Sequence, residues 1–194
     1  YVGNLESGGA RLETPPRRLT LDERQDLPAA WTPDSKAVLF YSNRSGNWHI
    51  YAQRVDQGFA EPLVATTRAD INPRLSPDGA WVTYPSFAKA ADILTSAPSE
   101  LRRIPVTGGP SQEVLTAHGY DNHYCARAPV TLCVVGEETD DRTQLIFTAF
   151  DPVKGRGREV GRIATNPGFT YNWGLSPDGS QIAIVFQKLG ACII

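Results

Sequence analysis

The sequence predicts an all-β protein built from repeated four-stranded units. A proline-containing turn motif recurs along the 194 residues at nearly constant spacing, and a run rich in β-branched and aromatic residues follows each copy. Proline (15 residues) and glycine (17 residues) are spread over the whole length, which is typical of many short strands joined by turns. The 3.6-residue periodicity of an amphipathic helix is not found over any window of useful length.

The turn motif reads Thr-Pro-Asp-Ser once and Ser-Pro-Asp-Gly twice, at 32–35, 76–79 and 176–179. Proline presets φ, aspartate bonds to its own backbone and glycine accepts a positive φ, so each copy predicts a hairpin turn. The first two copies are 44 residues apart, and the last two are 100 apart, or twice 50. A degenerate copy is therefore expected near residue 127, where the sequence reads Ala-Arg-Ala-Pro.

Each unit contains further strands beyond the turn. The strand after the turn is expected at 37–41, 81–84, 131–135 and 181–186. A third strand is expected at 50–56, 101–106 and 145–151, followed by a glycine-containing loop and a fourth at 61–66, 112–116 and 158–163. Four short strands in a unit of about 44–52 residues are typical of a β-propeller blade.

We therefore predict one β-propeller fragment over 1–194, with three whole blades at 21–67, 68–117 and 118–166. Residues 1–8 align with 51–58, so 1–20 is predicted to supply the outer strands of a half-blade. Residues 167–186 would supply the inner strands of a complementary half-blade. The last eight residues, 187–194, do not continue the repeat and are expected to be a truncation or a foreign tail.

The Ser-Pro-Asp-Gly turns and the stretch Tyr-Ser-Asn-Arg-Ser-Gly-Asn-Trp-His-Ile-Tyr at 41–51 resemble the TolB-like, WD-repeat-like β-propeller repeat. The resemblance covers nearly the whole chain and is weakest in the third unit, whose turn lacks Asp-Gly. Residues 125–155 also look like the propeller part of bacterial multidomain sensor or kinase-type proteins. The sequence contains no kinase motif and no G-x-S-x-G nucleophile elbow of the kind that accompanies propellers in prolyl-oligopeptidase-type enzymes.

Two open half-blades would expose strand edges and apolar faces. If the halves join between two chains, they close an eight-bladed ring at roughly 45° per blade, and within one chain a four-bladed ring at roughly 90°. Propellers of the resembling family usually have six or seven blades, at about 51–60° per blade. The angle per blade in an eight-bladed ring is closer to this range than the angle in a four-bladed ring. We predict an eight-bladed homodimer in which each chain completes the other's hybrid blade, with a four-bladed monomer as the alternative.

Composition excludes several classes of protein. Nineteen Lys and Arg against 21 Asp and Glu give a formal charge of −2, which argues against a nucleic-acid partner. No apolar run approaches the roughly 18 residues that span a bilayer, so no membrane partner is expected and the chain should be soluble. Cys125 and Cys133 flank a proline-containing turn and could face each other across a hairpin, but two small buried hydrophobes are favoured. The compartment stays open between bacterial cytoplasm and periplasm.

Candidate ligand-binding residues follow from the alignment of the units. The loops that lead into the innermost strands surround one mouth of a propeller channel, where function is usually placed. Asp26 and Asp70 occupy equivalent positions, with Asp121 or Asn122 at the third copy and Thr170 or Tyr171 at the fourth. Acidic groups at this mouth would attract a cation or a basic ligand, whereas the simpler interpretation is that each aspartate bonds its own loop.

The densest group of metal-ligating residue types is the stretch 118–125. Asp121 and His123 share one face of an extended strand, and His118 could fold back from the loop. Two histidines and a carboxylate can hold Zn²⁺ or another divalent cation with an open position for water or an ester. Asp121 and His123 are the candidate catalytic residues of such a site. The spacing is not diagnostic of any known metal motif.

The sequence thus favours a binding or interaction scaffold that takes a peptide, protein or small molecule at the channel mouth. The alternative is a promiscuous metal-dependent hydrolase of esters, phosphoesters or phosphotriesters. Trp31 and Trp173 lie near the inner strands and could line the channel, although packing in the core is favoured for both.

Overall fold

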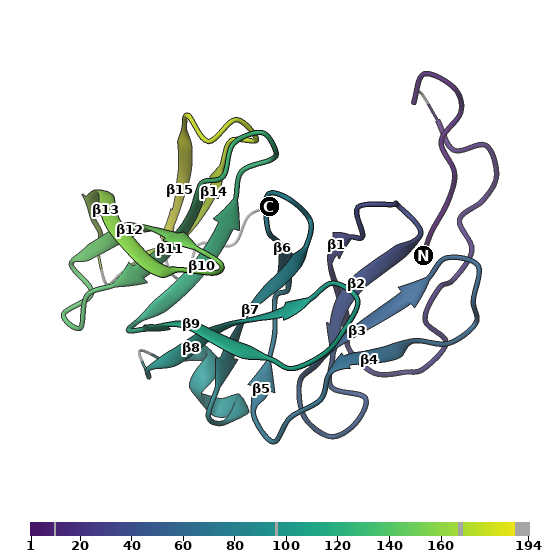
Figure 1. Ribbon diagram of the computed structural model, residues 1–194, viewed down its shortest axis with the longest axis horizontal. Helices are drawn as coiled ribbons and strands as arrows, with labels where there is room; N and C mark the ends of the chain where they lie inside the picture. Colours follow the sequence, from purple (N-terminus) through teal and green to yellow (C-terminus); the bar gives the residue numbers. More distant parts are fainter. Residues whose placement is uncertain (10, 96, 167–168, 189–194) are drawn as a thin grey trace.

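The computed structural model of the protein describes residues 1–9, 11–95, 97–166 and 169–188. These residues form antiparallel β-sheets and one short 3-10 helix, η1 (Ala90–Leu94), which confirms the predicted all-β class (Figure 1). No helix among them is long and apolar enough to cross a membrane.

The first sheet has four strands in chain order. They are β1 (Asp26–Trp31), β2 (Ala37–Ser42), β3 (His49–Arg54) and β4 (Glu61–Val64). The turn between β1 and β2 is the Thr-Pro-Asp-Ser motif, whose Ser35 has the positive φ (58°) that the motif predicts. The hydroxyl of Thr32 donates to Asp34 over 2.7 Å, and the backbone nitrogen of Lys36 donates to the same carboxylate.

The second sheet repeats this order but its inner strand is broken. The strands are β5 (Ala69–Asp70), β6 (Arg74–Leu75), β7 (Trp81–Phe87), β8 (Ser99–Pro105) and β9 (Gln112–Ala117), and both β5 and β6 pair with β7. Asn72 lies between β5 and β6 with φ +46°, and Pro73 next to it has no amide hydrogen to donate. These two residues interrupt the pairing and leave Arg74 at the start of a separate short strand.

The third sheet contains β10 (Tyr120–Cys125), β11 (Cys133–Glu138), β12 (Gln144–Asp151) and β13 (Gly155–Ala164), again in chain order. Cys125 and Cys133 form a disulfide, which corrects the expectation of two unbonded buried cysteines. They are direct partners in the β10–β11 register, with their Cα atoms 4.0 Å apart, so their side chains meet across the two strands.

The fourth sheet has only two strands in the described residues, β14 (Phe169–Leu175) and β15 (Ile182–Lys188). The side chains of Val185 and Phe186 on β15 are 68% and 47% exposed. β15 continues through residue 188, and the rest of the predicted tail lies outside the described residues.

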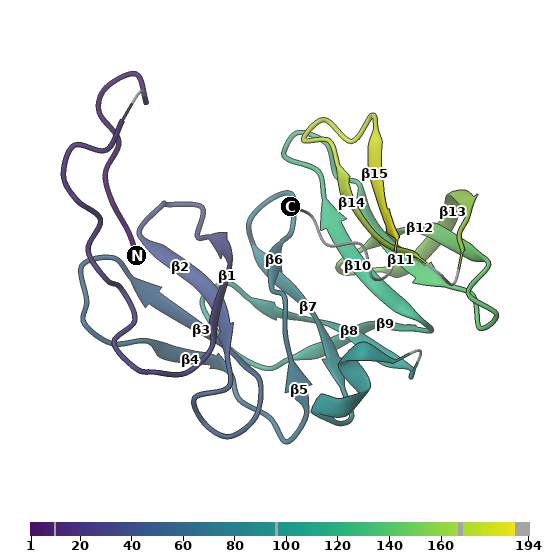
Figure 2. The ribbon, with the colours of Figure 1, turned by 180° about the vertical axis from the view of Figure 1, so that it is seen from behind.

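The sheets follow one another around an arc, with the first strand of each next to the first strand of its neighbour (Figures 1 and 2). Contacts join β1 to β6, β6 to β10 and β10 to β14. Apolar clusters fill the spaces between successive sheets. Leu39 and Tyr84 lie between the first and second sheets, Leu101 and Cys133 between the second and third, and Trp173 packs β14 on the third.

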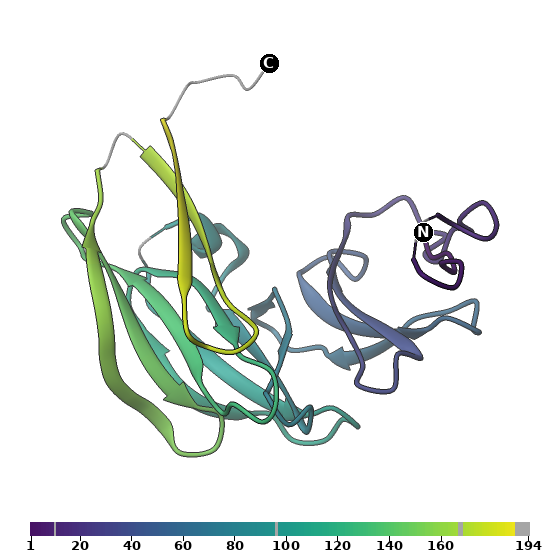
Figure 3. The same cartoon turned by 90° about the horizontal axis from the view of Figure 1, so that it is seen from above.

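The N-terminal segment lies at the opposite end of the arc from β14 and β15 in all three views (Figure 3). Isolated antiparallel bridges join Val2 to Arg17 and Leu5 to Leu12. The segment 1–20 does not pair with β15 of the same chain, so the described residues do not close into a four-bladed ring.

Candidate functional site

The first strands β1, β6, β10 and β14 lie side by side and form a shared surface, which we call the inner face. Two asparagines bond across it between the second and third sheets. The Nδ2 of Asn72 donates to Oδ1 of Asn122 over 2.9 Å, and the backbone nitrogen of His123 donates to the same oxygen. The Nδ2 of Asn122 in turn donates to the hydroxyl of Tyr124 over 3.2 Å.

These asparagines occupy equivalent positions in successive units. Asn72, Asn122 and Asn172 are spaced by 50 residues, and each is at least partly exposed. The Oδ1 of Asn172 accepts a hydrogen bond from its neighbour's backbone nitrogen over 2.9 Å, as the Oδ1 of Asn122 does. Sequence reasoning gave Asn122 only as an alternative to Asp121 and missed Asn72 and Asn172, although their constant spacing was a signal that could have found them.

Arg74 lies on β6, next to the inner strands of both neighbouring sheets. Its Nη1 donates to the carbonyl of Ala29 on β1 over 3.4 Å, and its guanidinium carbon lies 4.7 Å from the centre of the Tyr124 ring on β10. Its Nε is buried and has no hydrogen-bond partner among the described residues. The inner face therefore combines one arginine with several amide groups.

The two candidate tryptophans have different surroundings. Trp173 is 3% exposed and meets the rings of Tyr124 and Phe147 edge-on, with centroids 4.9 and 5.0 Å away, so it packs in the core as favoured. Trp31 is 48% exposed and lines an open pocket of about 380 Å³ with the N-terminal segment, including Val2 and Arg17. Core packing was therefore the wrong expectation for Trp31.

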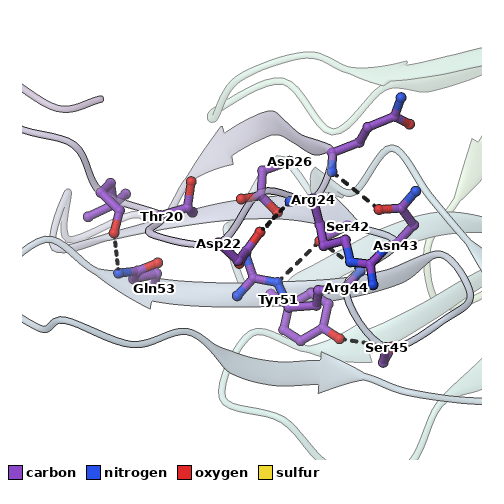
Figure 4. A network of polar contacts seen from close by, with 12 residues as sticks. Thr20, Asp22, Arg24, Asp26, Ser42, Asn43, Arg44, Ser45, Tyr51 and Gln53 are labelled. Carbon is purple, nitrogen blue, oxygen red and sulfur yellow. Dashed lines mark hydrogen bonds and ion pairs between the residues drawn. The ribbon is translucent and has the colours of Figure 1, made fainter.

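Asp26 is held by Arg44 within the first sheet (Figure 4). The Nη2 of Arg44 lies 2.8 Å from Oδ1 of Asp26 and 3.0 Å from Oδ2 of Asp22. The same guanidinium lies over the rings of Phe40 and Tyr51. Burial would raise the pKa of Asp26, but the hydrogen bonds it accepts, chiefly from Arg44, outweigh burial and lower the pKa below its ordinary value. This carboxylate is already neutralised by a cation of its own blade.

Asp70 is completely buried between the first and second sheets. Its carboxylate accepts hydrogen bonds from the hydroxyls of Ser86 over 2.6 Å and Thr66 over 2.7 Å, and Nδ1 of His49 lies 4.0 Å away. Burial raises the pKa of Asp70 above its ordinary value despite these hydrogen bonds. With no exposed surface, the carboxylate of Asp70 is placed as an internal structural group and does not face a ligand.

His123 is also completely buried, between the second and third sheets. Its Nε2 lies 3.0 Å from the hydroxyl of Thr83, and its Nδ1 lies 2.8 Å from the hydroxyl of Tyr120. Burial lowers the pKa of His123 to about 3, and the nearby charge of Arg74 contributes to this shift. Both ring nitrogens already have hydrogen-bond partners, which leaves neither free to bind a metal ion in this arrangement.

The other predicted site residues are not brought together with His123. His118 is exposed and borders an open pocket of about 410 Å³ beside Glu137, whose carboxylate pairs with Arg156 over 2.6 Å. Tyr171 on β14 contacts the ring of Phe186. The side chain of Asp121 lies outside what the structure describes. Within the described part of the chain, no group of three or more His, Cys, Asp or Glu side chains is placed to hold a metal ion.

Solved structures show which class of fold these sheets form. The chain is similar to a TolB-type protein from Agrobacterium tumefaciens (18% identity, TM-score 0.63), covering 92% of this chain and 62% of that one. It is also similar to TolB from Acinetobacter baumannii (20% identity, TM-score 0.55), covering 96% of this chain and 43% of that one. No protein-family model matches the chain.

The chain is also similar to a puromycin-hydrolyzing peptidase from Mycobacterium tuberculosis (15% identity, TM-score 0.59), covering 95% of this chain and 28% of that one. At these identities the likeness shows the fold alone. The sheets have the β-propeller fold of these neighbours. The chain spans about three fifths of the Agrobacterium protein and less of the other two.

Proposed function

We propose that the protein is a β-propeller binding scaffold that takes a peptide or small ligand on its inner face. The observation that carries this proposal is the hydrogen-bonded pair Asn72–Asn122, which joins two sheets and remains partly exposed. Amide side chains offer both donors and acceptors, so they suit a ligand with peptide groups. Asn122 lies on β10, and a hydrogen-bonding side chain on a strand keeps its geometry better than one on a loop.

Other propellers of this kind support the proposal only at the level of fold. TolB proteins and a peptidase have similar sheets, and one fold hosts many activities. The predicted acidic mouth is not retained in the proposal, because Asp26 is paired with Arg44 and Asp70 is buried. The inner-face asparagines take the place of these aspartates as the proposed contact residues.

A defined library of synthetic hexapeptides, screened by binding to the purified chain, tests the proposal. We expect at least one peptide to bind and its affinity to fall at least tenfold in Asn122→Leu. The control is Asn43→Leu, since Asn43 follows β2 in the first sheet and accepts a hydrogen bond from the backbone of Gln25. Equal loss in both variants, or no binding peptide, would overturn the proposal. Zinc bound at about one ion per chain, with turnover of a phosphotriester, would favour the hydrolase instead.

We further propose that two chains assemble by exchanging half-blades into an eight-bladed homodimer. The sheet β14–β15 has two strands where the other sheets have four or more. The bridge between Val2 and Arg17 is antiparallel, as is the pairing of β3 with β4. Tyr1 and Leu5 are exposed at one end of the arc, and Phe186 is exposed at the other. A second copy would cover both ends.

The mass of the particle tests this assembly. Light scattering on the purified chain is expected to give twice 21.2 kDa, and the value should not change over a tenfold dilution above the dissociation constant. A particle of 21.2 kDa at all concentrations would rule out the dimer.

We also propose that the chain works in an oxidising compartment, such as the bacterial periplasm. The support is the disulfide Cys125–Cys133, since disulfides persist in such compartments and are rare in the cytosol. Thiol labelling of the protein isolated from its host under acid quench should find both cysteines blocked. Free thiols at both positions would place the protein in a reducing compartment.

A further inference from the structure

We infer that Arg74 is the anchor for a carboxylate group of the ligand on the inner face. This inference rests on the proposed scaffold function and names the chemical class of its ligand. Arg74 lies on β6, between the inner strands of the first and third sheets.

The charge of Arg74 is not neutralised by any acidic side chain that the structure describes. Other partly buried arginines of the chain have such partners, for example Arg44 with Asp26 and Arg102 with Glu100. Among the described residues, no ion pair of Arg74 is found, and the one hydrogen bond of its side chain is the 3.4 Å contact with the carbonyl of Ala29. Its Nε is buried without a partner. A buried donor without a partner is costly, so this guanidinium is less fully satisfied than those of Arg44 and Arg102. Arg74 as a whole is only partly buried, so its remaining donors would bind an anion.

The guanidinium lies over an aromatic ring. Its carbon lies 4.7 Å from the centre of the Tyr124 ring, and that ring is itself packed edge-on against Trp173 at 4.9 Å. Stacking on an aromatic ring leaves the edge of a guanidinium available for the two parallel hydrogen bonds that a carboxylate accepts. An arginine ordered in advance loses less entropy when a ligand binds.

Three ionisable side chains of this region leave the charge of Arg74 unopposed. His123 is neutral at pH 7 because burial, with a smaller contribution from Arg74, lowers its pKa to about 3. Asp26 is neutralised by Arg44, and Asp70 is buried within its own hydrogen bonds. A carboxylate near Arg74 would therefore meet no unpaired acid from Asp26 or Asp70, whereas the side chain of Asp121 lies outside the described residues.

The neighbours of Arg74 favour a carboxylate over a phosphate. Asn72 is two residues away, and Asn122 bonds to the hydroxyl of Tyr124, over whose ring Arg74 lies. Amides beside a single arginine suit a carboxylate attached to peptide groups. A phosphate has a larger charge and more acceptor oxygens, and would be expected to recruit more than one cation. The ligand we infer is an acidic peptide.

Calorimetric titration with two tetrapeptides tests the inference. One peptide is made only of glutamate and the other only of glutamine, and both are acetylated at the N-terminus and amidated at the C-terminus. Inorganic phosphate is the third probe. We expect the glutamate peptide to bind at least tenfold more tightly than the glutamine peptide. Arg74→Gln should abolish this preference, and Arg74→Lys should weaken it because the planar fork is lost. The matched control is Arg103→Gln, in which an arginine 4.2 Å from the ring of Trp81 is removed from a different face.

A second measurement keeps the test valid if Arg74→Gln folds poorly. The ¹⁵N resonance of the Arg74 Nε, assigned by its loss in Arg74→Lys, should shift when the glutamate peptide is added to the unaltered protein. Equal binding of both peptides would overturn the carboxylate inference and leave the scaffold standing. Tighter binding of phosphate than of either peptide, or no binding of the glutamate peptide, would also overturn it. Failure of the wider hexapeptide screen is the separate result that would remove the scaffold itself.

Discussion

His123 shows how a side chain with catalytic potential becomes a structural element. Its two ring nitrogens bond to the hydroxyls of Thr83 and Tyr120, which lie on different sheets, so the imidazole joins the second sheet to the third. The sequence pointed to this residue but could not show that it is buried. Period-two alternation placed it on one face of a strand, and only the packing of the neighbouring sheet decided that this face is internal.

The buried imidazole predicts a pH dependence of stability. The pKa of His123 is about 3 in the folded chain and near 6.5 when it is unfolded, so between these values the unfolded state binds more protons. His123 therefore makes the free energy of unfolding fall as pH drops below about 6.5, by up to about 1.4 kcal/mol per pH unit. Urea unfolding of the native protein and of His123→Gln at pH 7, 6, 5 and 4 should give a shallower decline for the variant.

The control for this titration is His118→Gln, because His118 is exposed. It should retain the decline of the native protein. If His123→Gln and the native protein lose stability in parallel, His123 is not the buried neutral group that its surroundings indicate.

At the scale of single residues, the repeat alignment correctly paired Asp26 with Asp70 but did not give their surroundings. Both lie beside a serine on the second strand of their own sheet, and Asp26 also meets Arg44. Contacts of this kind depend on side chains from distant parts of the sequence. The spacing of the units could not show which of the equivalent residues are exposed.

At the scale of elements, the disulfide between β10 and β11 predicts a measurable loss of stability on reduction. It closes a short loop with a sequence separation of 8, for which loop entropy gives about 2.5 kcal/mol. Urea unfolding with and without a reductant should show a difference of this size in the native protein. The double variant Cys125→Ala/Cys133→Ala should be less stable by a similar amount and insensitive to reductant. An unchanged midpoint on full reduction would contradict the prediction.

The contact between β11 and β14 predicts a second effect. A Cβ on Gly136 would lie 2.9 Å from Nε1 of Trp173, so Gly136→Ala must displace the indole that packs β14 onto the third sheet. We expect a loss of about 1–3 kcal/mol in the free energy of unfolding. Gly161→Ala on β13 is the control, since a Cβ there meets no atom within 4 Å, and it should change stability by less than about 1 kcal/mol. Equal effects in the two variants would show that Trp173 accommodates the methyl group.

The strands themselves were largely predictable, because the turn motif fixes where each hairpin begins. Gly79 and Gly179 have positive φ at the last position of the motif, as the turn chemistry requires. The third unit was predicted less accurately. There the motif is degenerate, β11 begins at Cys133 instead of 131, and β13 begins at Gly155 inside the predicted loop. The break between β5 and β6 was not foreseen, although Asn72-Pro73 is a pair that disfavours a continuous strand.

At the scale of the whole molecule, the proposed half-blade exchange predicts a specific register. Leu39 pairs with Ala52 between β2 and β3, and Ala183 and Val2 are their equivalents in the repeat. Val2→Cys/Ala183→Cys, made with Cys192→Ser, should form a disulfide between two chains on mild oxidation. A non-reducing gel should show a species of twice 21.2 kDa.

Val2→Cys/Val153→Cys in the same background is the matched control, because Val153 is exposed on a turn of the third sheet and should not cross-link. A bond formed within one chain would support the four-bladed monomer. Equal cross-linking of both pairs, or none for Ala183, would contradict the exchanged half-blade.

The bare edge of β15 has a practical consequence for anyone who handles the protein. In the proposed dimer a second copy covers this edge, and dilution below the dissociation constant would separate the two copies. The separated chains would expose Val185 and Phe186 beside a strand edge, which is the kind of surface that pairs with other chains.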